Sequence, residues 1–574
     1  MKIEVSKNNT RALLMVFMLS TALGFAACQQ PSSDQEPGAV ASLDLPAGVE
    51  TAAEAIHEEA IRDHIAALSS DEFEGRAPAS PGDEKARQYL QDAMAEMGLE
   101  PGAQNGEWQQ RFPIMSITSE VPETWSFEGQ ESNLELAYWD DFIASSGVQR
   151  ESSRIDDAEI VFVGFGIEAP EYAWDDFKGV DVEGKVLLMM NNDPDWDPEL
   201  FEGDRRLYYG RWTYKYEMAA RHGAAGAIII HTTPSAGYSW QVVQASWTGA
   251  NFELPAGEEP RSQVSAWVTE DAARHLVATS GHDLDDLRES AKSRDFQPVP
   301  LGITTSLELS NSIESVETGN VAGLLEGSDP ELKNEVVVYS AHHDHFGIGE
   351  PDEEGDDIYN GALDNASGCS KVLAIADAFT RLPEPPRRSV LFLFVAAEEQ
   401  GLLGSEYYAK NPTFAPGLIA ANVNIDGANI FGRTSDVAYI GFGKSTLDDV
   451  VVAAAARQGR TVVGDQFPDR GSFYRSDQFN FSKIGVPAIY ADSGTTYIDR
   501  PEGWGKEQAE AWEAVHYHQP SDELTDDWNF EGIVEDTVLA FEAGLSIAQT
   551  DELPAWRPGD EFEAARIEAL AELD

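Results

Sequence analysis

Apolar runs with the length of strands recur through the second half of the chain and alternate with amphipathic stretches of helical period. The apolar runs predict strands at residues 335–341, 389–397, 419–425, 437–442 and 485–491. Helical patterns fall at residues 367–381, 402–409, 446–458 and 531–548. Nearly continuous apolar strands separated by helices predict an α/β fold, with a mostly parallel mixed sheet that helices cover on both faces.

The segment from about 146 to 304 has a different pattern, with short strands, many turns and many aromatic residues. AEIVFVGFGI, GKVLLMM and SQVSAWV predict strands, and EMAARHG predicts a helix that ends at Gly223. This segment is therefore expected to form a compact α/β module. Before it, residues 80–98 predict a helix, because Ser80 can cap its start and Pro81 suits its first turn.

The first residues predict an export signal rather than a part of the fold. Lys2, Lys7 and Arg11 precede an apolar stretch that ends in FAAC at Cys28. FAAC resembles a bacterial lipobox, which implies cleavage before Cys28 and a stable lipid anchor on it. Gln29 follows, rather than Asp, and this resembles export to the outer membrane or periplasm. Phe25 stands where lipoboxes usually have leucine, so ordinary cleavage and secretion stay an alternative.

The charge of the chain limits its partners. With 39 Lys and Arg residues against 101 Asp and Glu residues, the net charge is −62. Nucleic-acid binding needs a basic surface and is therefore excluded; we interpret the acidity as a strongly hydrated surface. Since Cys369 is the only cysteine besides Cys28, we expect no intrachain disulfide in the mature chain and a core position for Cys369.

Polar residues follow three of the predicted strands at the point where each strand ends. HHDH (342–345) follows the first, Glu398 and Glu399 the second, and Asp426 the third. In such sheets ligands bind outside the carboxyl ends of strands, so these side chains should lie together. Two more clusters, NGALDNASG with Asp364 and VHYHQPSDEL with His518, add ligand-type residues. Histidines and carboxylates without cysteine suit a hydrolytic zinc site, and their number suits two ions that share a water.

The motifs AHHDHFG, NGALDNASG, AAEEQGLLGSEYY, NIDG and YHQPSDE follow one another in this order. Together they resemble the co-catalytic di-zinc aminopeptidase family, which includes bacterial leucyl aminopeptidases and glutamate carboxypeptidases. DEFEGRAPASPGDEKARQYL resembles the N-terminal segment of the same peptidase fold, and VGFGIEAPEYAWDDFKGVDVEGKVLL resembles a protease-associated domain. The resemblance implies a zinc-exopeptidase fold of the phosphorylase/hydrolase-like class, interrupted by an inserted domain.

The predicted organisation follows from these segments. It comprises a signal peptide with lipobox (1–28), a flexible linker (29–53), the N-terminal part of a peptidase domain (54–145), an inserted protease-associated domain (146–304), the catalytic part (305–550) and an acidic C-terminal tail (551–574).

Roles for single residues come from the resemblance. It implies that His342 and Asp426 bind one zinc ion and that Glu399 and His518 bind the other. Asp364 would bridge the two ions.

Three further residues carry implied roles beside the ligands. Glu398 would be the general base, and Asp344 would orient the ring of His342. Tyr517 would donate to the oxyanion, with simple packing as the alternative. The remaining histidines of the two clusters, His343, His345 and His516, are expected to support the site from outside the ligand set or to face solvent.

The sequence therefore predicts an exported zinc exopeptidase that acts on peptides, and specifically an aminopeptidase. A carboxypeptidase acting on acidic C-termini is the close alternative, because Arg470 and Arg475 could hold a terminal carboxylate. A single-zinc glutaminyl cyclase is disfavoured, since both halves of the zinc site are complete. From another class, a non-catalytic binding protein on this fold is disfavoured because no predicted ligand is missing. Contact with a membrane is expected only through Cys28.

Overall fold

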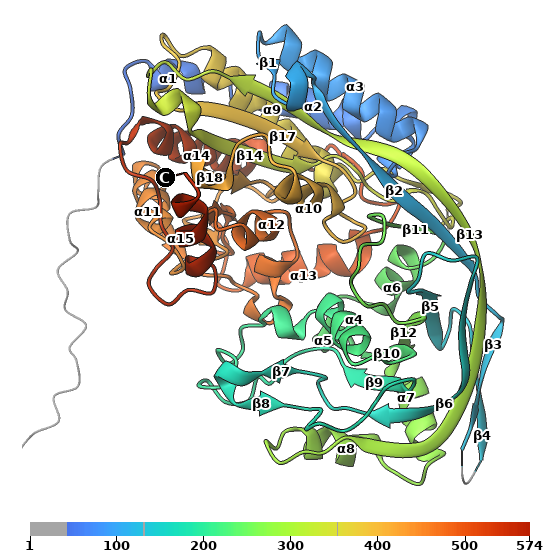
Figure 1. Cartoon of the computed structure of the whole chain (residues 1–574). Coiled ribbons are helices and arrows are strands. Elements are labelled where there is room, and N and C mark those ends of the chain that lie inside the picture. The colour runs from blue at the N-terminus through green and yellow to red at the C-terminus, as the bar shows by residue number, and fades with distance from the viewer. Residues whose placement is uncertain (1–42, 130–131, 353, 574) are drawn as a thin grey trace, which may run out of the picture. The chain divides into compact units, whose positions relative to one another are not determined.

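The computed structural model describes residues 43–129, 132–352 and 354–573 (Figure 1). Its main sheet has 15 strands, and the order along its principal path is β21-β18-β14-β17-β13-β6-β9-β10-β12-β5. Helices flank this sheet, so the fold is mixed α/β as predicted.

Neighbouring parallel strands form the part of the sheet that carries the predicted ligands. They are β14 (Val336–His342), β17 (Ser389–Val395), β18 (Ile419–Asn424) and β21 (Ala488–Ile489). The strands predicted at 335–341, 389–397 and 419–425 are confirmed. The strand predicted at 437–442 is β19 (Asp436–Tyr439), which lies outside this sheet and pairs with β20 (Thr461–Val463) and β22 (Ala491–Ser493).

Both faces of the parallel strands are buried, which explains why their sequences are apolar throughout. Val337 and Tyr339 point to one face, against α2 (Glu58–Leu68), α9 (Ser367–Thr380) and α14 (Phe530–Gln549). Val336 and Val338 point to the other, where α10 (Leu403–Lys410) and α12 (Gln478–Lys483) contribute Tyr408 and Phe481. Each such buried side chain contributes about 1.5–3 kcal/mol. The predicted helices at 367–381, 402–409 and 531–548 are thus confirmed.

The module predicted near residues 146–304 continues the same sheet instead of forming one of its own. Its strands are β5 (Phe142–Ser146), β6 (Ser152–Phe162), β9 (Val186–Met190), β10 (Gly226–His231) and β12 (Val264–Thr269). They join the parallel strands through β13 (Val299–Leu325), which pairs with β6 near its start and with β17 near its end. Figure 1 shows β13 as one long curved strand. The predicted boundary at 304/305 falls within it.

The helix predicted at 80–98 is α3 (Pro81–Glu96), and its start is built as expected. The Ser80 side chain accepts a hydrogen bond from the backbone N–H of Asp83 at 3.2 Å. The Asp83 side chain is completely buried, where it pairs with Arg87 and with His343 Nε2 at 3.0 Å. Helix α3 is thereby tied to the HHDH segment.

The segments predicted as a flexible linker and as an acidic tail both contain helices. The predicted linker (29–53) ends in helix α1 (Val49–Ala53), whose Val49 and Ala52 are buried in the core. The predicted acidic tail (551–574) contains α15 (Glu563–Ala571). Its residue Arg566 is buried and donates hydrogen bonds to the backbone carbonyls of Pro416 and Ile419, which attach this segment to the fold.

The predicted signal peptide and Cys28 lie outside the described residues and stay predictions. Among the residues that the structure does describe, no helix is long and apolar enough to cross a bilayer. Cys369 is buried in α9, as expected.

Candidate metal centre

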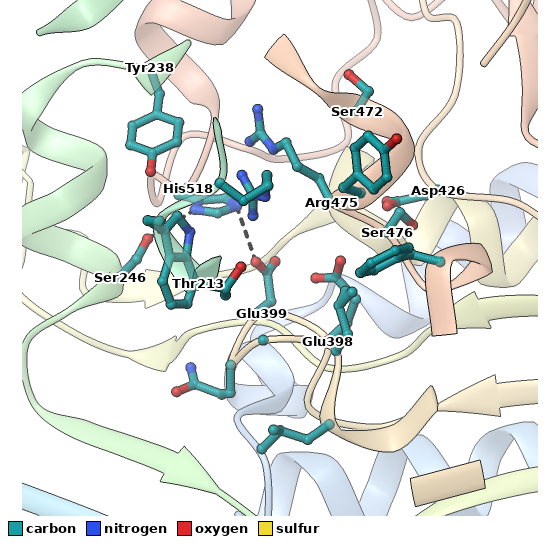
Figure 2. Close-up of a pocket in the computed structure, with 18 of the residues that line it drawn as sticks. Thr213, Tyr238, Ser246, Glu398, Glu399, Asp426, Ser472, Arg475, Ser476 and His518 are labelled. Carbon is teal, nitrogen blue, oxygen red and sulfur yellow. Dashed lines mark hydrogen bonds and ion pairs between the residues drawn. The ribbon is translucent and has the colours of Figure 1, made fainter. Parts of the chain in front are cut away.

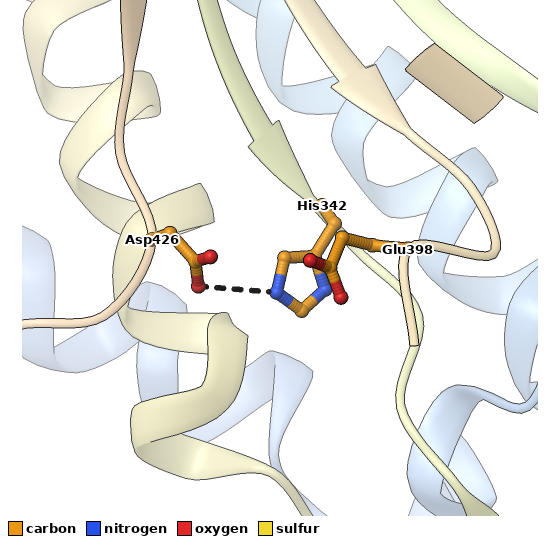
Figure 3. A group of neighbouring side chains, drawn as sticks. All are labelled: His342, Glu398 and Asp426. Carbon is orange, nitrogen blue, oxygen red and sulfur yellow. Dashed lines mark hydrogen bonds and ion pairs between the residues drawn. The ribbon is translucent and has the colours of Figure 1, made fainter. Parts of the chain in front are cut away.

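The predicted ligands from the main sheet lie at one edge of it. His342 is the last residue of β14, Glu398 and Glu399 follow the end of β17, and Asp426 follows the end of β18. Because these strands are parallel, their carboxyl ends meet, and Figure 3 shows His342, Glu398 and Asp426 side by side. Candidate ligand atoms of these three residues all lie within 4.8 Å of one another.

Asp364 stands between two histidines. Its Oδ1 atom lies 3.2 Å from Nε2 of His342, and its Oδ2 atom lies 3.3 Å from Nε2 of His518. Asp426 Oδ1 approaches the same nitrogen of His342 at 3.2 Å, and Glu399 Oε2 approaches His518 Nε2 at 3.1 Å. The structure therefore brings all five predicted ligands into two adjacent groups that share Asp364.

The donor set fits divalent cations. His518 Nε2 is buried and makes no hydrogen bond of acceptable geometry, although two carboxylate oxygens lie close to it. Donors that converge on a point without bonding one another are typical of metal ligands. In addition, four carboxylates gather here around two imidazoles, and burying such an excess of negative charge is costly unless cations offset it.

Glu398 and Glu399 are adjacent in sequence but have opposite electrostatic surroundings. Burial, together with the carboxylates of Asp426 and Glu399, holds the pKa of Glu398 well above its usual range. Burial and Asp364 act in the same direction on Glu399, but the imidazoles of His518 and His345 outweigh them and lower its pKa to about 2. When two neighbouring carboxyl groups have pKa values this different, the one with the raised pKa can transfer protons and the one with the lowered pKa stays ionised. Here these are Glu398 and Glu399, respectively.

Asp344 fixes the Glu398–Glu399 peptide, a contact that the sequence did not suggest. Its two carboxylate oxygens accept hydrogen bonds from the backbone N–H groups of Glu398 (3.0 Å) and Glu399 (3.4 Å). Nδ1 of His342 forms a hydrogen bond with the backbone carbonyl of Asp344 at 3.2 Å, whereas the carboxylate of Asp344 is 3.8 Å away. Asp344 is fully buried, and burial raises its pKa to about 7. It therefore supports three site residues at once, whereas the prediction gave it only His342.

The other histidines of the HHDH segment are buried. His343 pairs with Asp83, and His345 Nδ1 lies 2.7 Å from Oε1 of Glu399, which leaves the second oxygen of that carboxylate to face His518. His516 is half-buried and contacts Ser521. The expectation that these histidines lie outside the ligand groups agrees with these contacts.

Two residues that hold the loops of the site are not among the residues that the sequence singles out. Asp522 accepts hydrogen bonds from the backbone N–H of Leu363 (2.8 Å) and Asp364 (3.0 Å). Asn365 accepts one from the N–H of Gly427 (2.9 Å), which ties the Asp364 loop to the Asp426 loop. Asp522 is the Asp of the motif YHQPSDE, and Asn365 is the second Asn of the motif NGALDNASG. Their place inside these motifs is the feature of the sequence that could have identified them.

A cavity of about 1150 Å³ opens over these residues, and the module supplies part of its wall. Figure 2 shows Glu398, Glu399, Asp426 and His518 around the cavity, with Tyr238 and Ser246 on the module side. Ser246 is the last residue of α6 (Trp240–Ser246), and its Oγ atom lies 3.1 Å from Nδ1 of His518. The module thus contacts a predicted ligand directly.

Tyr517 lies in the cavity wall next to His518. Its ring stacks on the His518 imidazole, with centroids 3.7 Å apart, and its hydroxyl accepts a hydrogen bond from Arg475 at 3.1 Å. Its predicted role as a donor to the oxyanion stays a prediction. Arg470 and Arg475 both line the cavity, but Arg470 is paired with Glu513.

Residues 320–542 match Peptidase family M28. Over 229 residues the chain is 29% identical to leupeptin-inactivating enzyme 1 of Streptomyces exfoliatus, covering 39% of this chain and 47% of that protein. It is 26% identical over 263 residues to the probable leucine aminopeptidase 2 of Aspergillus fumigatus, covering 44% and 49%. The chain thus spans about half the length of these curated relatives.

Among solved structures, the aminopeptidase from Aneurinibacillus sp. strain AM-1 aligns over 88% of this chain and 97% of that one, with a TM-score of 0.53 and 19% identity. This likeness shows a shared fold. The sequence match with the family spans every predicted ligand, from His342 to His518. Residues 320–542, which carry the candidate metal centre, are therefore similar to Peptidase family M28.

Proposed function

We propose that this chain is an aminopeptidase that binds two zinc ions and removes N-terminal residues from peptides. The position of Asp364 is the observation that carries the proposal. Its two oxygens face two imidazoles that belong to separate ligand groups, as a carboxylate shared by two ions requires. The relatives named as leucine aminopeptidases support the reaction class, and the export signal rests on residues 1–28 alone.

We assign metal binding and proton transfer to different residues of the site. His342 and Asp426 would hold one ion, and Glu399 and His518 would hold the other. When bound, zinc lowers the pKa of water and polarises a carbonyl group. Of the two carboxylates that directly follow β17, Glu399 pairs with His518, whereas Glu398 lies beside His342 and Asp426. Glu398 would accept the proton of the attacking water and pass it to the leaving amine.

Geometry supports this role for Glu398. The backbone N–H groups of Glu398 and Glu399 both donate hydrogen bonds to Asp344, so the peptide that carries the Glu398 side chain is held in place at the site. The raised pKa of Glu398, caused first by burial, suits a group that must hold a proton between two transfers.

Removal of metal tests the proposal. Dialysis against a chelator should abolish hydrolysis of leucyl anilides, and added zinc should restore it, with metal analysis giving two ions per chain at full recovery. Full activity after removal of all metal would contradict the metallopeptidase, and full recovery with one ion would contradict the shared site. Any metal-dependent turnover would also exclude a non-catalytic binding protein.

The end of the peptide from which residues are released distinguishes an aminopeptidase from a carboxypeptidase. A carboxypeptidase is favoured by one observation, namely that Arg475 lines the cavity and could hold a terminal carboxylate. Matched peptides with a free or an acetylated N-terminus should show cleavage only of the free form, with release of the first residue. Release of the last residue from the acetylated peptides would instead establish the carboxypeptidase.

The contact between the module and His518 predicts an effect on metal affinity. Ser246→Ala should weaken zinc binding by about 10–100-fold. Loss of the hydrogen-bond partner on the second ring nitrogen of a metal-binding histidine typically lowers metal affinity by this factor. Competition with a chromophoric chelator measures it. Ser239→Ala, at the start of the same helix and without a side-chain hydrogen bond to that helix, is the matched control and should leave the affinity unchanged. Equal affinities for wild type and Ser246→Ala would show that the contact does not position His518.

A further inference from the structure

Strand β11 (Ala250–Glu253) of the module has an edge without a partner strand, and its residues line the cavity of the metal centre. Within the part of the chain that the structure describes, β11 pairs only with β2 (Gln109–Glu120), in an antiparallel register that places Phe252 opposite Ser116. In an antiparallel strand the backbone groups of successive residues point alternately to its two sides. One side of β11 therefore bonds β2, and the other side is open to a further strand.

The backbone of Phe252 belongs to the open edge of β11. Its N–H group donates a hydrogen bond to Oε1 of Gln400 at 3.1 Å and so points away from β2. The carbonyl group of the same residue points to the same side. Gln400 directly follows Glu398 and Glu399, and these three residues line the cavity together with Phe252. The open edge therefore begins at the turn that carries the proposed general base.

The group that Phe252 binds is itself an amide. The side chain of Gln400 ends in a carboxamide, whose carbonyl oxygen accepts hydrogen bonds as the carbonyl of a peptide bond does. An extended peptide along this edge offers the same acceptor to the N–H of Phe252, and its own N–H adds a bond to the carbonyl of Phe252. Domains that bind extended peptides by strand addition use unpaired strand edges in this way.

We propose that the open edge of β11 binds the backbone of the substrate on the leaving side of the scissile bond, as an additional strand. The proposal rests on the aminopeptidase function proposed above. An aminopeptidase removes one residue at a time, so the part before the scissile bond is too short to pair with a strand. Only the leaving part is long enough. Because all peptides share the same backbone groups, this edge favours longer peptides without selecting their side chains.

The length of the leaving part gives the first test. Leucyl-alanine amide and leucyl-trialanine amide share the same scissile bond, and both lack a carboxylate. The longer amide should have a kcat/KM about 2–12-fold higher. This is the contribution of one hydrogen bond, because the substrate carbonyl only replaces Gln400 whereas the bond to the Phe252 carbonyl is new. Equal values for the two amides would overturn the proposal.

A binding measurement with N-methylated peptides tests for a strand without any turnover. The peptide is leucyl-tetraalanine amide with its first peptide bond reduced to CH₂–NH, so that it cannot be hydrolysed. Its nitrogen is methylated in turn at the third, fourth and fifth residues. Since alternate residues of a strand face its neighbour, calorimetric titration of the zinc-loaded protein should show about 2–12-fold weaker binding for the third and fifth residues, or for the fourth alone. Equal effects at all three positions, or none, would overturn the proposal.

Proline at position 252 removes the donor from the open edge, and its ring fills the place where a substrate strand would approach. Proline is tolerated in edge strands where the N–H faces away from the neighbouring strand, so pairing with β2 should persist. Phe252→Ala is the matched variant, because it also loses the aromatic ring but keeps the N–H. The preference for the longer amide should disappear in Phe252→Pro and persist in Phe252→Ala. Equal preferences in the two variants would overturn the proposal.

Leucyl anilide separates failure of this edge from failure of the proposed function. It has no peptide after the scissile bond, so Phe252→Pro and Phe252→Ala should hydrolyse it with the same kcat/KM. Hydrolysis of the anilide by wild type without any preference for longer amides would remove the strand edge and leave the aminopeptidase intact. Alternating effects of N-methylation on binding support the edge even where the anilide is not cleaved.

Discussion

Replacing Glu398 with glutamine should lower kcat by about 10²–10⁴-fold, the usual contribution of a positioned general base, while the zinc content stays at the wild-type value. Glutamine keeps the shape of the side chain and leaves the two backbone hydrogen bonds to Asp344 intact. It cannot take up a proton. Steady-state kinetics with a leucyl anilide, together with metal analysis of the same preparation, measure both quantities.

The metal analysis decides between two roles for Glu398. Its carboxylate lies close enough to His342 and Asp426 to be a ligand, so a loss of zinc in Glu398→Gln would show that it binds metal instead of moving a proton. Wild-type kcat with full zinc content would show that another group is the base. Glu406→Gln is the control, since Glu406 lines the cavity but pairs with Lys410, and its kcat should stay near the wild-type value.

The ligand set could be predicted because local sequence fixes where each parallel strand ends. The length and the Val and Phe content of an apolar run such as VLFLFV favour a buried strand over a helix, and the residue after its last apolar position leaves the sheet at the carboxyl edge. The sequence therefore predicts that His342, Glu398 and Asp426 lie together, and Figure 3 shows them side by side. Asp364 and His518 do not follow strands, and only the resemblance of their motifs assigned them.

Contacts across long sequence distances could not be predicted in the same way. Ser246 and His518 are 272 positions apart, and no periodic pattern connects a helix end in the module with a ligand of the peptidase part. Strand β13 was missed because its 27 residues far exceed an ordinary strand and its middle is polar, as at Glu314 and Glu317. Cross-strand pairing with β2 (Gln109–Glu120) along that middle holds it extended where side-chain burial does not.

Asp364 is the residue on which both halves of the site depend. Its backbone N–H is held by Asp522, and its two oxygens face His342 and His518 at 3.2 and 3.3 Å. Asparagine in its place offers one oxygen and an NH₂ group, which is a hydrogen-bond donor and cannot serve as a ligand. One of the two histidine groups must then lose a ligand, whichever way the amide turns, and the other group keeps only a neutral amide oxygen in place of a carboxylate, so both groups should bind zinc more weakly.

Asp364→Asn should therefore lose more bound zinc than Asp426→Asn, although each variant changes one carboxylate. Asp426 faces only His342, so its loss should leave the ion at Glu399 and His518 in place. Zinc at 100 times the Kd of each site should raise the free energy of unfolding of the wild type by about 2.7 kcal/mol for each bound ion and leave that of Asp364→Asn almost unchanged. Thermal unfolding with and without zinc measures this difference, and kcat of Asp364→Asn should fall below detection. Equal zinc loss in the two variants would show that Asp364 serves one ion only, and two separate metal sites would then replace the shared one.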